Sequence, residues 1–101
     1  MIDRLEQEVD TLQRHLEVLR MVLENEPIGI VRMSNETGHP HHKIRYSLRV
    51  LEEASLIEPT SQGAATTKET SEFVAGLNGR IDDITTTVDE MSIEATVESS
   101  S

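Results

Sequence analysis

The sequence predicts a mainly α-helical protein that carries one small β-hairpin. Near both ends of the chain, apolar residues recur in alternating steps of three and four, which is typical of a helix with one apolar stripe. The middle holds two shorter stretches with helical spacing, divided by a glycine. After them comes a stretch rich in threonine and small residues around Ser-Gln-Gly, which predicts two short strands joined by a turn.

The first predicted helix covers residues 1–26. Pro27 ends it, because proline supplies no backbone N–H and disfavours helical geometry at the residue before it. The apolar stripe of this helix is named here the N-terminal seam. It consists of Ile2, Leu5, Val9, Leu12, Leu16, Leu19 and Leu23. Such heptad spacing favours packing against another helix.

Residues 27–67 are predicted to hold two short helices and the hairpin. Gly38 is expected to close the first of these helices, because glycine adopts the left-handed conformation that follows many helices. The apolar side chains expected to turn inward from it are Ile30, Val31 and Met33. His39-Pro40 opens the next helix, since proline suits a first helical turn, and this helix is expected to continue to about Ala54.

This second short helix is predicted to have two different faces. Its buried stripe follows steps of four and three through Ile44, Leu48 and Leu51. The opposite face then carries His42, Arg45, Tyr46 and Arg49, with Lys43 to one side and His41 near the start. The alternative is an ordinary solvated face on which the arginines pair with Glu52 and Glu53.

The hairpin and a second long helix complete the chain. Pro59 confines the first strand to a sheet edge. The long helix is predicted to begin at Thr66 or Thr67, with Glu69 three residues after Thr66 as in a capping box. Its stripe, the C-terminal seam, consists of Val74, Leu77, Ile81, Ile84, Val88 and Met91. The spacing continues through two glycines, which favours one helix, although a kink at Gly79 stays open.

We expect one domain over residues 1–91, because 101 residues are too few for two independent cores. Residues 1–26 and 68–91 would serve as dimerisation helices on either side of the middle segment. Residues 92–101 are polar, acidic and end in serines, so a disordered tail is expected there.

The net charge is −10, yet all of the excess negative charge lies outside the middle of the chain. Residues 27–67 hold four acidic and four basic residues, whereas residues 1–26 hold seven and three, and residues 68–101 hold eight and two. The total charge argues against a general polyanion binder, because an acidic surface repels phosphate. Few lysines and many acidic residues favour a halophilic protein of a salt-rich cytoplasm, with an ordinary acidic protein as the alternative.

Several classes of function find no support in the sequence. The absence of cysteine excludes disulfides, thiolate chemistry and cysteine-ligated zinc. No phosphate-binding loop, nucleophile elbow or metal-ligand motif is present, so we expect neither an enzyme nor a cofactor. His39, His41 and His42 lie close together, but no acidic partner stands at a ligand spacing, and no metal site is expected. Without a signal peptide or a membrane-spanning run, the chain is predicted to be cytoplasmic.

The order helix, short helix, turn, helix and small hairpin is that of a winged helix-turn-helix. The segment EPIGIVRMSNETGHPHHKIRYSLRVLEEASLI, residues 26–57, resembles the core of winged-helix transcriptional regulators of the ArsR, MarR and PadR type, especially small archaeal ones. The positions that match are Ile30 and Met33, Thr37-Gly38 at the turn, and Ile44, Leu48 and Leu51. Ser55 stands where glycine is common. The resemblance covers about a third of the chain, and the flanking helices match the family only in kind.

In such proteins the second helix of the motif enters the major groove of DNA. The resemblance implies that this chain binds double-stranded DNA as a transcriptional regulator. The implied contact residues are His41, His42, Lys43, Arg45, Tyr46 and Arg49, with Ser61 and Gln62 at the hairpin tip. Wings of the family often carry Arg or Lys, so this uncharged tip predicts fewer phosphate contacts and a shallower salt dependence. The histidines predict a DNA affinity that depends on pH.

The two seams hold more apolar surface than one small three-helix core can cover, which predicts a homodimer. The predicted interface residues are Ile2, Leu5, Val9, Leu12, Leu16, Leu19, Val74, Leu77, Ile81, Ile84 and Val88. Whether the seams pair within or between chains stays open. The alternative function is a protein-interaction module, in which a coiled-coil dimer uses the winged helix to bind another protein.

Overall fold

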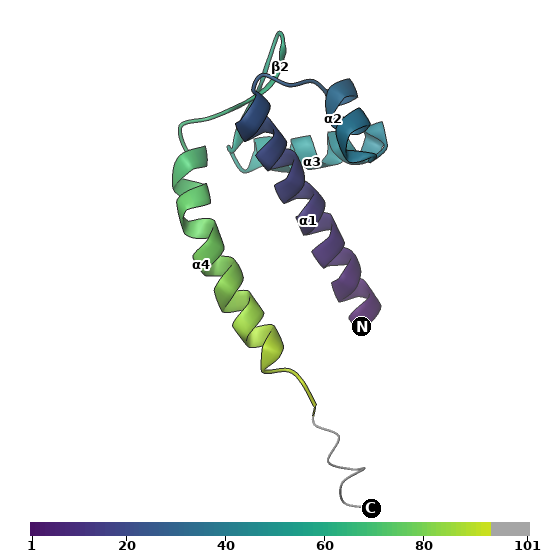
Figure 1. The fold of residues 1–101 in the computed structure, drawn as a ribbon, viewed down its shortest axis with the longest axis vertical. Coiled ribbons are helices and arrows are strands. Elements are labelled where there is room, and N and C mark those ends of the chain that lie inside the picture. The colour runs from purple at the N-terminus through teal and green to yellow at the C-terminus, as the bar shows by residue number, and fades with distance from the viewer. Residues whose placement is uncertain (94–101) are drawn as a thin grey trace, which may run out of the picture. The chain divides into compact units, whose positions relative to one another are not determined.

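The computed structural model describes residues 1–93, which form four α-helices and one two-stranded antiparallel sheet (Figure 1). In chain order the elements are α1 (Ile2–Asn25), α2 (Ile30–Thr37), α3 (His41–Glu53), β1 (Ile57–Thr60), β2 (Gly63–Thr66) and α4 (Thr70–Asp89). The predicted class, mainly helical with one small hairpin, is therefore confirmed. The described chain divides into two compact units, the first over Met1–Ser71 and the second beginning at Glu72.

α1 ends at Asn25, as the proline at position 27 predicts. The side-chain amide of Asn25 donates a hydrogen bond to the carbonyl of Met21, one turn earlier, at 3.0 Å. The carboxylate of Glu26 accepts hydrogen bonds from the backbone N–H and the hydroxyl of Thr66, at 3.0 and 2.9 Å. The end of α1 is thereby attached to β2.

The core of the first unit is small and aliphatic. From α1 it takes only residues of the C-terminal half, where Val18, Leu19 and Val22 are at most 2% exposed. The other buried apolar residues are Ile28, Met33, Ile44, Leu51, Leu56, Ile57 and Ala64. α3 packs against α1, and the exposed N-terminal half of α1 extends beyond the packed helices (Figure 1).

The hairpin has a third, very short neighbour. β1 and β2 pair in antiparallel register around the predicted Ser-Gln turn. On the other side of β2, the N–H of Ile28 donates to the carbonyl of Ala64 at 3.1 Å, and the N–H of Ala64 donates to the carbonyl of Ile28 at 2.8 Å. β2 therefore lies between two partners, and β1 lies at an edge, where Pro59 costs no ladder hydrogen bond.

Replacement of Gly63 with alanine is expected to lower the free energy of unfolding by about 2 kcal/mol or more. Gly63 has a φ of 130°, and a Cβ atom there would lie 2.5 Å from both the carbonyl carbon and the oxygen of Ile28. Backbone atoms cannot rotate away, so the bridge between Ile28 and β2 has to open. Chemical denaturation measures the loss. Gly76→Ala is the control, because a Cβ there meets nothing within 4 Å, and an equal loss in both variants would contradict the prediction.

Two details of the helices differ from the sequence prediction. Val31 is 60% exposed, whereas Met33 is fully buried and Ile30 is half-buried. The prediction for Val31 is wrong because Ile30 and Met33, three residues apart, share a helix face, while Val31 lies about 160° around the helix from Met33. Met91 lies beyond the end of α4.

α4 also begins later than predicted, at Thr70. The predicted capping box of Thr66 and Glu69 is wrong, because Thr66 ends β2 and bonds instead to Glu26, the residue after α1. The cap is formed one residue further on. The Thr70 hydroxyl oxygen accepts a hydrogen bond from the N–H of Thr67 at 2.9 Å, and the Thr67 hydroxyl oxygen accepts one from the N–H of Glu69 at 3.2 Å. From there α4 continues through both glycines to Asp89 as one helix, as predicted.

Among the described residues, no helix is both long and apolar enough to cross a membrane. Of the predicted tail at residues 92–101, only Ser92 and Ile93 are described, and both are exposed. The rest of that prediction lies outside the described residues. A single domain over residues 1–91 stays a prediction.

Candidate nucleic-acid interface

α3 has one face in the core and one face in solvent. Ile44 is fully buried, Leu51 is 4% exposed and Leu48 is half-buried, so the predicted stripe is confirmed. Ser47 lies on the same side and is also fully buried, although the apolar pattern does not include it. The exposed residues of α3 include all six that the sequence predicts for DNA contact: His41, His42, Lys43, Arg45, Tyr46 and Arg49.

The arginines of α3 have no acidic partner in the described part of the chain. Within residues 1–93, neither Arg45 nor Arg49 has a guanidinium nitrogen within 4 Å of a carboxylate oxygen, so pairing with Glu52 or Glu53 is absent there. The contrast is Arg32 on α2, which forms an ion pair with Glu36 one turn away. The cations on α3 are therefore available to an anion from outside the unit.

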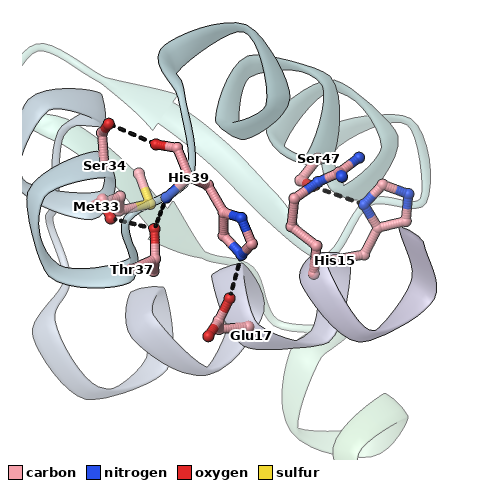
Figure 2. Close-up of polar contacts among 8 residues, drawn as sticks. His15, Glu17, Met33, Ser34, Thr37, His39 and Ser47 are labelled. Carbon is pink, nitrogen blue, oxygen red and sulfur yellow. Dashed lines mark hydrogen bonds and ion pairs between the residues drawn. The ribbon is translucent and has the colours of Figure 1, made fainter. Parts of the chain in front are cut away.

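The turn between α2 and α3 is fixed by hydrogen bonds. Gly38 has a φ of 81°, as a helix-ending glycine should, and its N–H donates to the carbonyl of Ser34 at 2.9 Å. The Ser34 hydroxyl donates to the carbonyl of His39 at 2.6 Å. The Thr37 hydroxyl donates to the carbonyl of Met33 at 2.8 Å and accepts from the N–H of His39 at 3.1 Å (Figure 2). These bonds set the position at which α3 begins.

The three clustered histidines have different surroundings. His39 is half-buried, and its Nε2 lies 2.7 Å from a carboxylate oxygen of Glu17 on α1 (Figure 2). His41 and His42 are exposed on α3. Within the described residues, no group of three or more histidine, aspartate or glutamate side chains is placed to hold a metal ion. His39 thus joins the turn to α1, and only the other two histidines belong to the exposed face.

A second polar contact joins α1 to the middle of α3. The Ser47 hydroxyl lies 2.7 Å from Nδ1 of His15 and accepts a hydrogen bond from Nε of Arg14 at 3.1 Å. Burial, and then the positive charge of Arg14, lower the pKa of His15 below its ordinary value. The neutral form of His15 is therefore favoured in the folded protein.

Tyr46 belongs partly to the exposed face and partly to α1. Its side chain is 48% exposed, but its ring centroid lies 5.5 Å from that of His15, with the ring planes tilted by 49°. Together with Arg4, Glu8 and Leu12, these two rings line a shallow hollow on the first unit. Tyr46 therefore contacts α1 as well as solvent.

The hairpin tip is polar and uncharged. Ser61 and Gln62 are both exposed. The Thr60 hydroxyl donates to the carbonyl of Gly63 at 2.7 Å and accepts from the N–H of Gln62 at 3.2 Å, which closes the turn. The only charged residue in the two strands and their turn is Glu58. The tip offers hydrogen-bonding groups to a partner but no cation.

The predicted interface residues of α1 divide into two groups. Ile2, Leu5, Val9 and Leu12 are between 44% and 57% exposed, whereas Leu16 is half-buried and Leu19 is only 2% exposed. Leu19 is part of the core of its own unit. In the second unit, Val74, Ile84 and Val88 are exposed, and Leu77 and Ile81 are half-buried. Within the first unit, an apolar stripe therefore remains uncovered on the first three turns of α1.

The residues that attach α3 to α1 were not found by sequence reasoning. Ser47 lies three residues after Ile44 and four before Leu51, so its place on the buried stripe was the available signal. No comparable signal exists for His15 or Glu17, whose partners are 32 and 22 residues away in the sequence.

No protein-family model matches this chain, and no curated protein matches it significantly.

Proposed function

We propose that this chain is a sequence-specific DNA-binding transcriptional regulator with a winged-helix fold. In this proposal it acts as a homodimer, and each subunit places α3 in the major groove of double-stranded DNA. The observation that carries the proposal is the exposed, cationic face of α3. Its two arginines have no carboxylate partner within residues 1–93, although the whole chain carries nineteen acidic residues.

The dimensions and chemistry of α3 suit a groove. The major groove admits one α-helix, and the 13 residues of α3 extend over about 20 Å. Arg45 and Arg49 can each donate two parallel hydrogen bonds to a guanine, and Lys43 can bind a phosphate. His41 and His42 lie in the first turn, the part of a recognition helix that approaches base edges.

The attachment of α3 supports the same proposal. Its rear is held by the buried stripe, and its start is fixed by the hydrogen-bonded turn after α2. Side chains held on a rigid element bind more tightly than mobile ones, because less conformational freedom is lost on binding. In the proposed complex the hairpin is the wing, and Ser61 and Gln62 contact the sugar-phosphate backbone through hydrogen bonds alone.

The proposed dimer rests on the uncovered stripe of α1. Ile2, Leu5, Val9 and Leu12 are spaced as one side of a coiled coil and are about half exposed. A second copy of the same helix would bury them. Two recognition helices related by a two-fold axis would then contact a palindromic site with half-sites about 34 Å apart.

Binding of the wild-type protein to duplex DNA tests the proposal. Selection from a random duplex pool should enrich an inverted repeat, and the affinity for it should fall as KCl rises. α3 carries three cations, Lys43, Arg45 and Arg49. If all three contacted phosphate, a dimer would make six such contacts through α3, so the slope of log K against log salt should not be steeper than about −5. A failure to enrich any sequence at any KCl concentration, up to the multimolar range of a halophilic cytoplasm, would contradict DNA binding.

The alternative, a protein-interaction module, is favoured by one observation. The hairpin carries Glu58 and no cation, which weakens any contact with phosphate. Under this alternative the same helical dimer would form, and the face of α3 would bind the acidic surface of another protein. Genome-wide mapping of DNA crosslinked to a tagged copy separates the two functions, since only a DNA-binding regulator should be enriched at promoters that share an inverted repeat.

A further inference from the structure

Two of the side-chain hydrogen bonds that join α1 to α3, or to the turn before it, are made by histidines. Glu17 contacts His39, one residue before the proline that precedes α3, and His15 contacts Ser47 in the middle of α3 (Figure 2). Each contact contains one histidine, but the partners differ in chemistry. One partner is a carboxylate, and the other is a hydroxyl that already accepts a hydrogen bond.

The contact between Glu17 and His39 is compatible with both protonation states of the ring. A carboxylate only accepts hydrogen bonds, so Nε2 of His39 must carry its hydrogen at a separation of 2.7 Å. A neutral ring can hold its single hydrogen on Nε2, and a charged ring holds one there as well. Protonation of His39 therefore leaves this bond in place.

The contact between His15 and Ser47 is compatible with only one protonation state of the histidine ring. Ser47 is fully buried, and its oxygen accepts the N–H of Arg14. Within the described residues, no other acceptor is recorded for the hydrogen of this hydroxyl, so we assign that hydrogen to Nδ1 of His15, which must then be unprotonated. A proton on Nδ1 turns this acceptor into a donor. Within the described residues, the buried hydroxyl then has two donors directed at it and no recorded acceptor for its hydrogen, which is costly in a buried position.

We propose that the contact between His15 and Ser47 is a proton-sensitive link. Protonation of His15 removes this contact and loosens the middle of α3, which Arg14 and the buried stripe still hold against α1. The contact between Glu17 and His39 keeps the start of α3 attached. Acidification then changes how firmly the exposed face of α3 is presented. The effect on DNA affinity rests on the proposed function, but the link itself does not.

The groups around His15 determine the pH at which the link opens. On α1, Arg14 opposes protonation, and Arg4 and Glu8 line the hollow beside the ring with opposite charges. On α3, the ring of Tyr46 covers one side of His15, and Ser47 bonds to it. Burial, followed by Arg14, lowers the pKa of His15 in the folded protein. The folded state therefore binds fewer protons than the unfolded one, and the stability due to the neutral ring is lost as the pH falls from about 6.5 through the lower folded pKa.

Amide hydrogen exchange tests the link without DNA. In the wild-type protein, the protection factors of amides in residues 44–51 should fall about fivefold between pH 8 and pH 5.5. In His15→Asn they should stay constant, because the amide occupies the place of Nδ1 and does not titrate. Ser47→Ala, which removes the hydroxyl and keeps the histidine, should also lose the pH dependence and serves if the first variant does not fold. His42→Asn is the matched control and should behave as wild type. The proposal would be overturned if the protection factors of the wild-type protein did not change with pH. It would also be overturned if they fell as much in His15→Asn and Ser47→Ala as in wild type.

A titration of DNA affinity supplies the second test. Any effect of pH on the exposed face of α3 itself is shared by every variant that keeps this face. The comparison is therefore between wild type and His15→Asn on the same selected duplex. The variant should bind equally at pH 8 and about fivefold more tightly at pH 5.5. Equal affinities at both values would overturn the regulatory role. If neither protein binds any duplex, the proposed function is wrong, and the exchange experiment still decides the link.

Discussion

Replacement of Arg45 and Arg49 together with glutamate is expected to weaken binding to the selected duplex at least 100-fold. Each arginine contact with a guanine is worth about 1–3 kcal/mol, and a carboxylate in its place repels the nearby phosphates. The fold should not change, because both side chains are exposed and neither has a carboxylate partner within residues 1–93. Fluorescence anisotropy measures the affinity, and circular dichroism measures the melting temperature.

A second double variant separates the position of the charges from their number. Arg20 on α1 and Lys68 after β2 are exposed cations outside α3, so Arg20→Glu with Lys68→Glu gives the same change in net charge. That variant should keep most of the affinity and lose only the small contribution of long-range attraction. If both double variants bind equally weakly, or if both bind as wild type, α3 is not the recognition helix.

Replacement of Leu12 with glutamate is expected to convert the dimer to a monomer at micromolar concentration. Leu12 is 48% exposed in the first unit, so glutamate there places no charge in the core. The melting temperature of the monomeric protein should therefore hardly change. In a dimer built on the N-terminal seam, the same change buries two uncompensated carboxylates, each at a cost of several kcal/mol. Light scattering reports the mass. The affinity for the inverted repeat should fall when the dimer dissociates, because a monomer contacts only one half-site.

The neighbouring residue gives a matched control for this experiment. Gln13 is exposed and lies off the seam, so Gln13→Glu adds the same charge and should remain a dimer. Ile84→Glu tests the C-terminal seam in the same way, since Ile84 is 57% exposed on α4. A monomeric mass for the wild-type protein, at low and at high KCl, would contradict the dimer itself. A monomeric mass for Gln13→Glu would show that charge, and not the seam, controls association.

Local chemistry was enough to predict most of the helix boundaries in the first unit. Pro27 limits α1 because a proline excludes helix just before it, and Gly38 ends α2 because it adopts a positive φ. The buried stripe of α3 was likewise predictable, because the positions of Ile44 and Leu51 on one face follow from helical geometry alone. The exposed position of Arg45 and Arg49 then follows from the same geometry.

The sequence prediction of the α4 cap failed because the residue concerned has a distant partner. Thr66 has the sequence of a helix cap, but the Glu26 carboxylate, forty residues away, binds its N–H and hydroxyl and leaves the cap to Thr67. A capping box is a local pattern, and it cannot register a competing acceptor from another element. The prediction that Val31 turns inward was wrong for a simpler reason, since an eight-residue helix buries only one narrow face.

The sequence by itself determined the mainly helical class, the hairpin and the cationic face of α3, because each depends on residues within a few positions of one another. Only the tertiary structure decided which polar side chains hold α3 in place. Hydrogen bonds of His15 to Ser47 and of Glu17 to His39 require atoms within about 3 Å. Separations that short between residues 22 or more positions apart depend on how α1 and α3 pack, and helical periodicity carries no information about that packing.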